Sequence, residues 1–237
     1  MPIRLRRILM TLEFLLLGHT VGAQAPKAAS TVVQTASGCV PLATAQEIPL
    51  HLVYPATSEL RDPARVTLTL EGDRLKVHFA VKTPTINARK TLAPNQYPYQ
   101  YDVVEVFVSA SGTVTHLPYY EFELSPYNQS YQVKIVDLKK PFIDGIQMGH
   151  EHSVHLGDGG WTADLSIPLK NLQWDGNPAN IFGNAYAVFG KKAVRSYWSL
   201  ALPVERKPNF HVPQSFVRLI SNPTAAAGSD TSVCPAN

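Results

Sequence analysis

Four carboxylate side chains lie within a short stretch of the chain, and their types could support acid–base or hydrogen-bonding chemistry. They are Asp102, Glu105, Glu121 and Glu123. Ionised carboxylates accept hydrogen bonds from hydroxyl groups, and two of them at a defined separation in a cleft can hydrolyse a glycosidic bond. Glu121 and Glu123 would share one face of a strand, but no motif fixes the separation of any pair. Hydrolysis is therefore the less favoured alternative.

Glu105 interrupts the otherwise apolar stretch VVEVFV, residues 103–108. Alternate residues of a strand point to opposite faces, and both faces of this stretch are apolar. The pattern predicts a central strand that is covered on both sides. Burying a lone carboxylate is costly unless something pairs with it. Either a structural Arg or Lys neutralises Glu105, or the strand opens onto a ligand at this point.

Three tyrosines at every second position, Tyr97, Tyr99 and Tyr101, precede this strand. They would share one face if the segment is extended. Tyrosine rings offer a flat apolar surface and a hydroxyl group, and sugar rings stack on such surfaces. Covering the end of an apolar core is an equally good use of the same rings.

A histidine cluster could hold a metal ion or haem. The segment MGHEHSVH contains Met148, His150, His152 and His155. In a strand, the first two histidines would share a face, and paired imidazoles bind metals. No CxxCH haem-attachment motif occurs, and no third ligand lies at a fixed spacing. A solvated strand edge is the favoured interpretation.

The segments that would position these residues are strands. Apolar residues alternate with polar ones, and clusters of Gly, Pro, Asn and Asp separate the runs, whereas helical periodicity is nearly absent. This pattern predicts an all-β fold, a single antiparallel β-sandwich over residues 46–220. Gly72-Asp73 predicts a hairpin turn. The expected strands lie within residues 48–54, 65–81, 102–110, 119–126, 131–137, 161–169, 185–190, 197–202 and 215–220.

Both ends of the 237-residue chain differ in character from this domain. Residues 1–23 combine three arginines with a short apolar stretch and small residues before a cleavage point, which predicts an export signal. Residues 24–45 and 221–237 are rich in small residues and predict a disordered linker and a flexible tail. The formal charge of +3 is too small to indicate nucleic acid or an anionic membrane as a partner.

Five segments in order resemble carbohydrate-binding module family 9, within the DOMON-like β-sandwich superfamily. They are YQYDVVEVFV, YYEFELSPYN, GGWTADLSIPL, YWSLAL and NFHVPQSFVRL. The resemblance spans residues from about 97 to 220 and implies a jelly-roll or immunoglobulin-like sandwich that clamps a sugar between two aromatic rings. Characterised members use tryptophan for both rings, whereas this chain has Tyr99 and Phe210 at the matching positions.

The resemblance also implies the other site residues. Glu105 matches the family's strand glutamate. Glu123 stands where an arginine helps to bind sugar, and Lys191 stands where many relatives have arginine. Trp198 lines either the site or the core. The full expected carbohydrate-binding set is Tyr99, Asp102, Glu105, Glu123, Lys191, Trp198, Phe210 and His211.

The expected function is therefore non-catalytic carbohydrate binding by an exported monomer, secreted or periplasmic, in polysaccharide catabolism. The expected ligands are xylan- or cellulose-type polysaccharides or oligosaccharides. A haem or metal electron-transfer domain using Met148 with His150 or His152 is the alternative, and a glycoside hydrolase is a weaker one. Some relatives hold a structural calcium ion, for which the sequence assigns no ligands; no catalytic residue, metal ligand or other cofactor is assigned.

The chain has two cysteines, Cys39 and Cys234, and export would place them in an oxidising compartment. We expect them to form a disulfide, with two unpaired thiols as the alternative. Reduction should then lower the melting temperature of the protein. Mass spectrometry before reduction should show two hydrogens fewer than after it. An unchanged mass would contradict the pairing.

Overall fold

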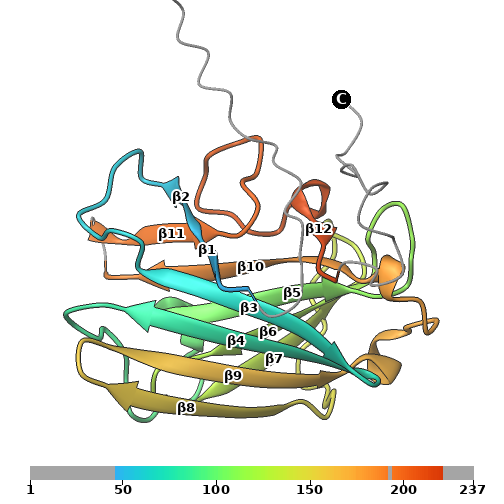
Figure 1. Cartoon of the computed structure of the whole chain (residues 1–237), viewed down its shortest axis with the longest axis horizontal. Coiled ribbons are helices and arrows are strands. Elements are labelled where there is room, and N and C mark those ends of the chain that lie inside the picture. Colours follow the sequence, from blue (N-terminus) through green and yellow to red (C-terminus); the bar gives the residue numbers. More distant parts are fainter. Residues whose placement is uncertain (1–45, 192–193, 221–237) are drawn as a thin grey trace, which may run out of the picture. The chain divides into compact units, whose positions relative to one another are not determined.

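The computed structural model describes residues 46–191 and 194–220, which form two antiparallel sheets (Figure 1). The first sheet has the order β1 (Ile48–Pro49), β3 (Ala64–Glu71), β4 (Arg74–Lys82), β9 (Gly160–Pro168) and β8 (Glu151–Gly157). The second has the order β2 (His51–Tyr54), β11 (Ser196–Ser199), β10 (Phe182–Phe189), β5 (Val103–Ser109), β6 (Tyr119–Leu124) and β7 (Ser130–Ile135), with β12 (Val217–Arg218) paired to β10.

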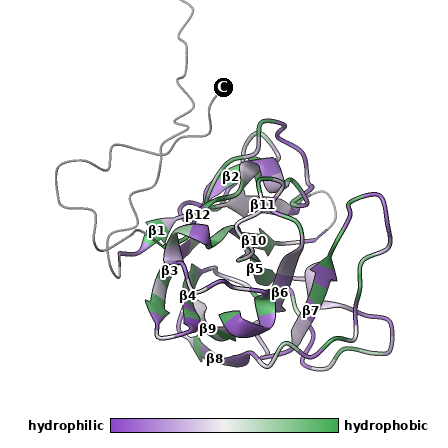
Figure 2. Ribbon diagram, turned by 90° about the vertical axis from the view of Figure 1, so that its right-hand side faces the viewer, coloured by the Kyte–Doolittle hydropathy of each residue, from purple (hydrophilic) through white to green (hydrophobic). Residues whose placement is uncertain are grey.

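The two sheets lie face to face, with β3, β4 and β9 opposite β10, β5 and β6 (Figure 2). The described residues form no α-helix. Their helical turns are the short 3₁₀ segments η1 (Pro98–Gln100), η2 (Leu169–Leu172), η3 (Pro178–Asn180) and η5 (Pro213–Ser215). The all-β sandwich expected from the sequence is confirmed.

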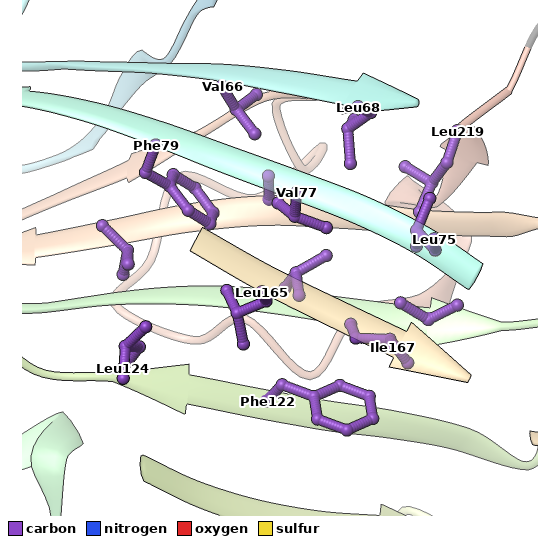
Figure 3. Close-up of a cluster of buried hydrophobic side chains, with 14 of the residues drawn as sticks. Val66, Leu68, Leu75, Val77, Phe79, Phe122, Leu124, Leu165, Ile167 and Leu219 are labelled. Atoms are coloured by element: carbon purple, nitrogen blue, oxygen red, sulfur yellow. The ribbon is translucent and has the colours of Figure 1, made fainter. Parts of the chain in front are cut away.

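Alternation along the strands builds the main core between the sheets. In β4, every second side chain from Leu75 to Val81 is buried, while the intervening ones lie on the outer face. The partners across the core come from β6 and β9, and Figure 3 shows this cluster of valine, leucine, isoleucine and phenylalanine side chains. Each such side chain stabilises the fold by about 1.5–3 kcal/mol when fully buried.

The hairpin between β3 and β4 turns where the sequence predicts it. Glu71 pairs with Arg74, and Gly72 between them has a φ of +61°. Glycine adopts this left-handed conformation without steric cost, which fits the twist of a two-residue hairpin.

The second sheet is covered on both faces. All seven residues of β5 are buried, and β10 and β6 flank the strand. Val104, Val106 and Val108 belong to the main core, whereas Val103 and Phe107 belong to a second apolar cluster on the outer face. Phe210 and Phe216, from the segment that follows β11, complete that second cluster. The prediction of a central strand covered on both sides is confirmed.

Tryptophans serve the main core and not an open surface. Trp161 and Trp198 are both buried in it. The indole N–H of Trp198 donates a hydrogen bond to Ser196 Oγ at 3.0 Å. Trp174 packs partly against the same core, and its indole N–H donates to the Asn177 carbonyl oxygen.

The predicted export signal, the linker 24–45, the tail 221–237 and both cysteines lie outside the described residues. Among the residues that are described, no helix is long and apolar enough to cross a membrane.

Candidate functional site

Strand register sets the framework of a site on the outer face of the second sheet. Tyr186 on β10 lies opposite Glu105 on β5, Glu105 lies opposite Glu123 on β6, and Glu123 lies opposite Tyr131 on β7. The next row on the same face contains Glu121 on β6. Directly opposed side chains in an antiparallel sheet are close neighbours. Three glutamates are therefore brought together on a face that is mostly apolar and aromatic.

These glutamates line a groove of about 690 Å³, which we name the carboxyl groove. Its walls come from the segment before β5, the loop between β7 and β8, strand β11 and the loop that follows it. The lining residues are Tyr99, Gln100, Tyr101, Glu105, Phe107, Glu121, Glu123, Tyr131, Val133, Phe142, Val188, Arg195, Tyr197, Pro208, Asn209, Phe210 and His211.

The carboxyl groups on the floor of the groove are almost entirely removed from solvent. The exposed fractions are 3% for Glu105, 5% for Glu121 and 0% for Glu123. The backbone N–H of Tyr99 donates to Glu123 Oε2 at 2.8 Å. Among the described residues, the other oxygen of Glu123, Oε1, has no hydrogen-bond partner. A buried acceptor without a partner is costly, so this atom marks a place where a proton or a ligand would stabilise the site.

Burial and mutual repulsion favour the protonated forms of these groups. Burial raises the pKa of Glu121 to about 7. Burial, followed by the charge of Glu121, raises the pKa of Glu105 well above its usual range, and the Arg195 guanidinium acts in the opposite direction. Burial and the charges of Glu105 and Glu121 likewise raise the pKa of Glu123. Each of these shifts favours the protonated form, because protonation offsets part of the cost of burying three carboxyl groups together.

Tyr99 supplies an accessible ring at the rim of the groove, 42% exposed. The tyrosine segment is not extended, because it forms the 3₁₀ turn η1, so the condition for three rings on one strand face is not met. This turn stacks the rings of Tyr97 and Tyr99 at 5.3 Å and 7°, and Tyr131 meets both edge-on. Tyr101 turns aside and accepts a hydrogen bond from Arg89 Nε at 2.7 Å. One face of Tyr99 is therefore supported by a neighbouring ring.

Phe210 and His211 form the opposite wall. Phe210 stacks on Tyr186 at a centroid distance of 4.1 Å, so one face of its ring is already in contact. His211 Nδ1 lies 2.8 Å from the hydroxyl oxygen of Tyr119, and its Nε2 lies 3.8 Å from Glu121 Oε2. Burial lowers the pKa of His211 to about 4, so this imidazole is neutral at neutral pH. Phe142 packs against the same imidazole at 4.5 Å.

Five of the eight residues expected at the site line the groove: Tyr99, Glu105, Glu123, Phe210 and His211. Three do not. Asp102 accepts hydrogen bonds from the backbone N–H groups of Asn87 and Gly190, each at 2.7 Å, and so holds two loops together. Trp198 lies in the main core, and Lys191 is exposed outside the lining. The contribution of the five lining residues to binding stays a prediction.

Sequence reasoning missed several lining residues. Tyr131 and Tyr197 lie on strands, and their alternation could have placed them on the outer face. Arg195 and Phe142 come from the segments beside β11 and β7, where no periodicity fixes direction. Arg195 donates to the carbonyl oxygens of Tyr99 and Gln100, and it thereby holds the aromatic segment against the groove.

The histidine cluster lies away from this groove. His150 Nε2 is 2.7 Å from Ser130 Oγ, and His152 Nδ1 is 2.8 Å from Asn128 Oδ1. Met148 is buried in the main core. Within residues 46–191 and 194–220, no group of three or more His, Cys, Asp or Glu side chains is arranged to hold a metal ion.

No family model matches the chain, and no curated protein matches it. Several solved structures are similar to it in fold. A candidate carbohydrate-binding protein from Bacteroides uniformis has a TM-score of 0.58 at 18% identity, covering 73% of this chain and 84% of that one. A family 9 carbohydrate-binding module from Caldicellulosiruptor kristjanssonii, in complex with cellotriose, has a TM-score of 0.52 at 16% identity, with coverages of 81% and 88%.

A family 9 module from the same organism, in complex with glucose, has a TM-score of 0.52 at 17% identity and covers 75% of this chain and 85% of that one. The chain has the fold of these modules. At these identities the likeness concerns the fold, and it confirms the β-sandwich that the sequence resemblance implied.

Replacing Asp102 tests its structural role. Asp102→Ala removes the acceptor for two backbone N–H groups, and we expect the free energy of unfolding to fall by about 2 kcal/mol. Denaturant unfolding measures this loss. Asp158→Ala, at an exposed turn, is the control and should change stability by less than about 0.5 kcal/mol. Equal stability of the two variants would contradict the role assigned to Asp102.

Replacing Glu121 tests the burial of the carboxyl cluster. Because the folded pKa is raised from 4.5 to about 7, the folded state binds the extra proton in this window. Stability from this group is fully present below pH 4.5 and is lost as pH rises through about 7. Glu121→Gln removes this dependence, so the variant should match its parent near pH 4.5 and exceed it by about 3 kcal/mol above pH 7.

Thermal unfolding of both proteins across this pH range measures the difference. Burial of neutral His211 lowers the stability of both proteins at acidic pH, where the unfolded chain binds a proton on this residue more readily. This effect is common to both proteins and largely cancels in the comparison. Glu151→Gln is the control, because the Glu151 side chain is exposed on β8 of the first sheet. The stability difference between this variant and its parent should not widen with pH. A constant difference between Glu121→Gln and its parent would contradict the raised pKa.

Proposed function

We propose that this protein binds carbohydrate in the carboxyl groove without cleaving it. The observation that carries the proposal is the meeting of an exposed, supported tyrosine ring with buried carboxyl groups in a single groove. Tyr99 forms the rim, and Glu105 and Glu123 form the floor. The likeness in fold supports the same proposal, since the two structural neighbours from Caldicellulosiruptor kristjanssonii are carbohydrate-binding modules.

A sugar ring matches this combination because it has an apolar face of C–H groups and a rim of hydroxyl groups. The free face of Tyr99 would stack on the apolar face. The carboxyl oxygens of Glu105 and Glu123 would accept hydrogen bonds from the hydroxyls. A protonated carboxyl group can also donate, so the floor can serve both kinds of hydroxyl contact. Affinity should lie in the micromolar to millimolar range, because an open groove buries only part of its ligand.

We further propose that the ligand is a xylan- or cellulose-type polysaccharide or oligosaccharide. Cellotriose and glucose are the ligands of the neighbouring modules. The export signal expected in residues 1–23 would deliver the protein to the periplasm or the exterior, where such polymers are degraded. A role in carbohydrate catabolism follows from this location.

Glycoside hydrolysis is the second function that a specific observation favours. Carboxyl groups with raised pKa values act as general acids in glycosidases, and Glu105, Glu121 and Glu123 have this property. Hydrolysis also requires an ionised partner at a set distance across the glycosidic bond. Release of reducing ends from a polysaccharide over time would reveal this activity, and its absence alongside measurable binding would favour binding alone.

Calorimetric titration with cello- and xylo-oligosaccharides tests the binding proposal. The parent protein should give saturable heat. Tyr99→Ala and Glu105→Gln should each weaken binding by roughly tenfold or more, because one removes a stacking surface and the other replaces a carboxyl group that would contact the sugar hydroxyls.

Tyr54→Ala is the matched control, because Tyr54 is 44% exposed and does not line the groove. Its affinity should equal that of the parent. Absence of heat with every sugar, from a protein with an intact thermal transition, would sink the proposal. Equal weakening by Tyr54→Ala and Tyr99→Ala would place the site elsewhere.

A further inference from the structure

The groove has an unbalanced charge. Three glutamates lie on its floor, and Arg195 is the one Lys or Arg among the described lining residues. The guanidinium of Arg195 donates to the carbonyl oxygens of Tyr99 and Gln100, and neither of these bonds goes to a carboxylate. The neutral His211 adds no compensating charge. The floor is therefore short of positive charge when its carboxyl groups are ionised.

Glu123 shows where the shortage is greatest. Its side chain is fully buried, its Oε2 accepts from the Tyr99 N–H, and its Oε1 has no partner within the described part of the chain. Glu105 faces it directly across the strand pair, and Glu121 is its neighbour on the same face. A proton on Glu123 that is shared with Glu121 would satisfy this oxygen in the empty groove. A cationic hydrogen-bond donor from a ligand would satisfy it as well and would interact with the other two carboxylates.

We propose that the groove selects sugars that carry a free amine, whose ammonium group would donate to Glu123 Oε1 and to the neighbouring carboxyl groups. This inference rests on the proposed function, since it names the class of sugar for the same site. An ammonium has three donors and no acceptor, which matches a floor of three acceptor groups. Charge-assisted bonds of this kind are roughly twice as strong as neutral ones. An N-acetylated amine is uncharged and bulkier and gains none of this.

The surrounding groups leave the negative field in place. The groove is otherwise lined by tyrosines, which supply no basic group: Tyr131 from β7, Tyr99 and Tyr101 from the segment before β5, and Tyr197 from β11. Asp144, in the loop between β7 and β8, adds a further negative charge near Tyr131. Arg195 is the opposing charge and partly offsets the field at Glu105. An ammonium group that binds here should therefore displace a proton from the carboxyl cluster into solvent.

Three trisaccharides that share a β-1,4 backbone and differ at carbon 2 form a matched set of probes. Cellotriose carries a hydroxyl, the glucosamine trimer an ammonium, and the N-acetylglucosamine trimer an acetamide. By calorimetry at mildly acidic pH, the glucosamine trimer should bind roughly tenfold tighter than cellotriose. Titration in two buffers of different ionisation enthalpy should show net proton release for the glucosamine trimer and little for cellotriose.

Variants locate the source of the preference. In Glu123→Gln and Glu121→Gln, the ratio of the two affinities should fall toward one, because the ammonium loses a charged acceptor. Glu151→Gln, which removes an exposed carboxylate on the other sheet, should keep the ratio of the parent.

The outcomes separate the two proposals. If cellotriose binds as tightly as the glucosamine trimer, the amine preference is overturned and carbohydrate binding stands. If no trisaccharide binds to the folded protein, both are overturned. A preference that persists in Glu123→Gln and Glu121→Gln would also overturn the inference, since the attraction would then arise outside the carboxyl cluster.

Discussion

Desolvation of three carboxyl groups is the constraint on which the outer face of this sandwich depends. A central strand that is covered on both faces leaves its side chains little contact with water, so a glutamate there must be neutralised, paired or held at the edge of an opening. In β5 the flanking strands and the second apolar cluster surround Glu105 closely. Glu105 nonetheless lies on the floor of the carboxyl groove, where a proton or a ligand can neutralise it.

The apolar cluster and the groove are two parts of one surface. Tyr186 lies opposite Glu105, and Phe107 lies opposite Glu121. Phe210, from the covering segment that follows β11, packs on Tyr186. The covering segment therefore closes most of the outer face and leaves the carboxyl groups open at one side. Its position also fixes His211 beside Glu121, so the wall of the groove is built by the same packing that buries the face.

Much of this could be predicted from the sequence because alternation is a local property. The burial of both faces of β5 followed from residues 103–108, and the main core followed from runs such as β4. The placing of Glu121 and Glu123 on one strand face followed from the period of two, although the direct opposition of Glu105 and Glu123 across two strands required the register. Register depends on the loop between β5 and β6, which no residue pattern in that loop determines.

The aromatic wall could not be predicted, for a different reason. The period-two spacing of the tyrosines suggested an extended segment, but Pro98 at the first position of η1 favours a turn, and Gln100 closes it by accepting from the Tyr97 N–H. Arg195 then fixes this turn from a segment distant in sequence. The resemblance of the chain to the family points to Tyr99, which lines the groove, but it does not give the orientation of the ring.

Phe210 illustrates the same distinction between position and availability. The resemblance placed an aromatic ring in this loop, and the structure places it in the groove wall. One face of the ring packs on Tyr186, Tyr197 meets it edge-on, and Phe210 is only 8% exposed, so little of its surface is open to a ligand. Tyr99 is likewise supported on one face by Tyr97. Two backed rings over a carboxyl floor make a groove with fixed walls, in which the charge state of the floor, and not the closure of a clamp, is the variable that a ligand changes.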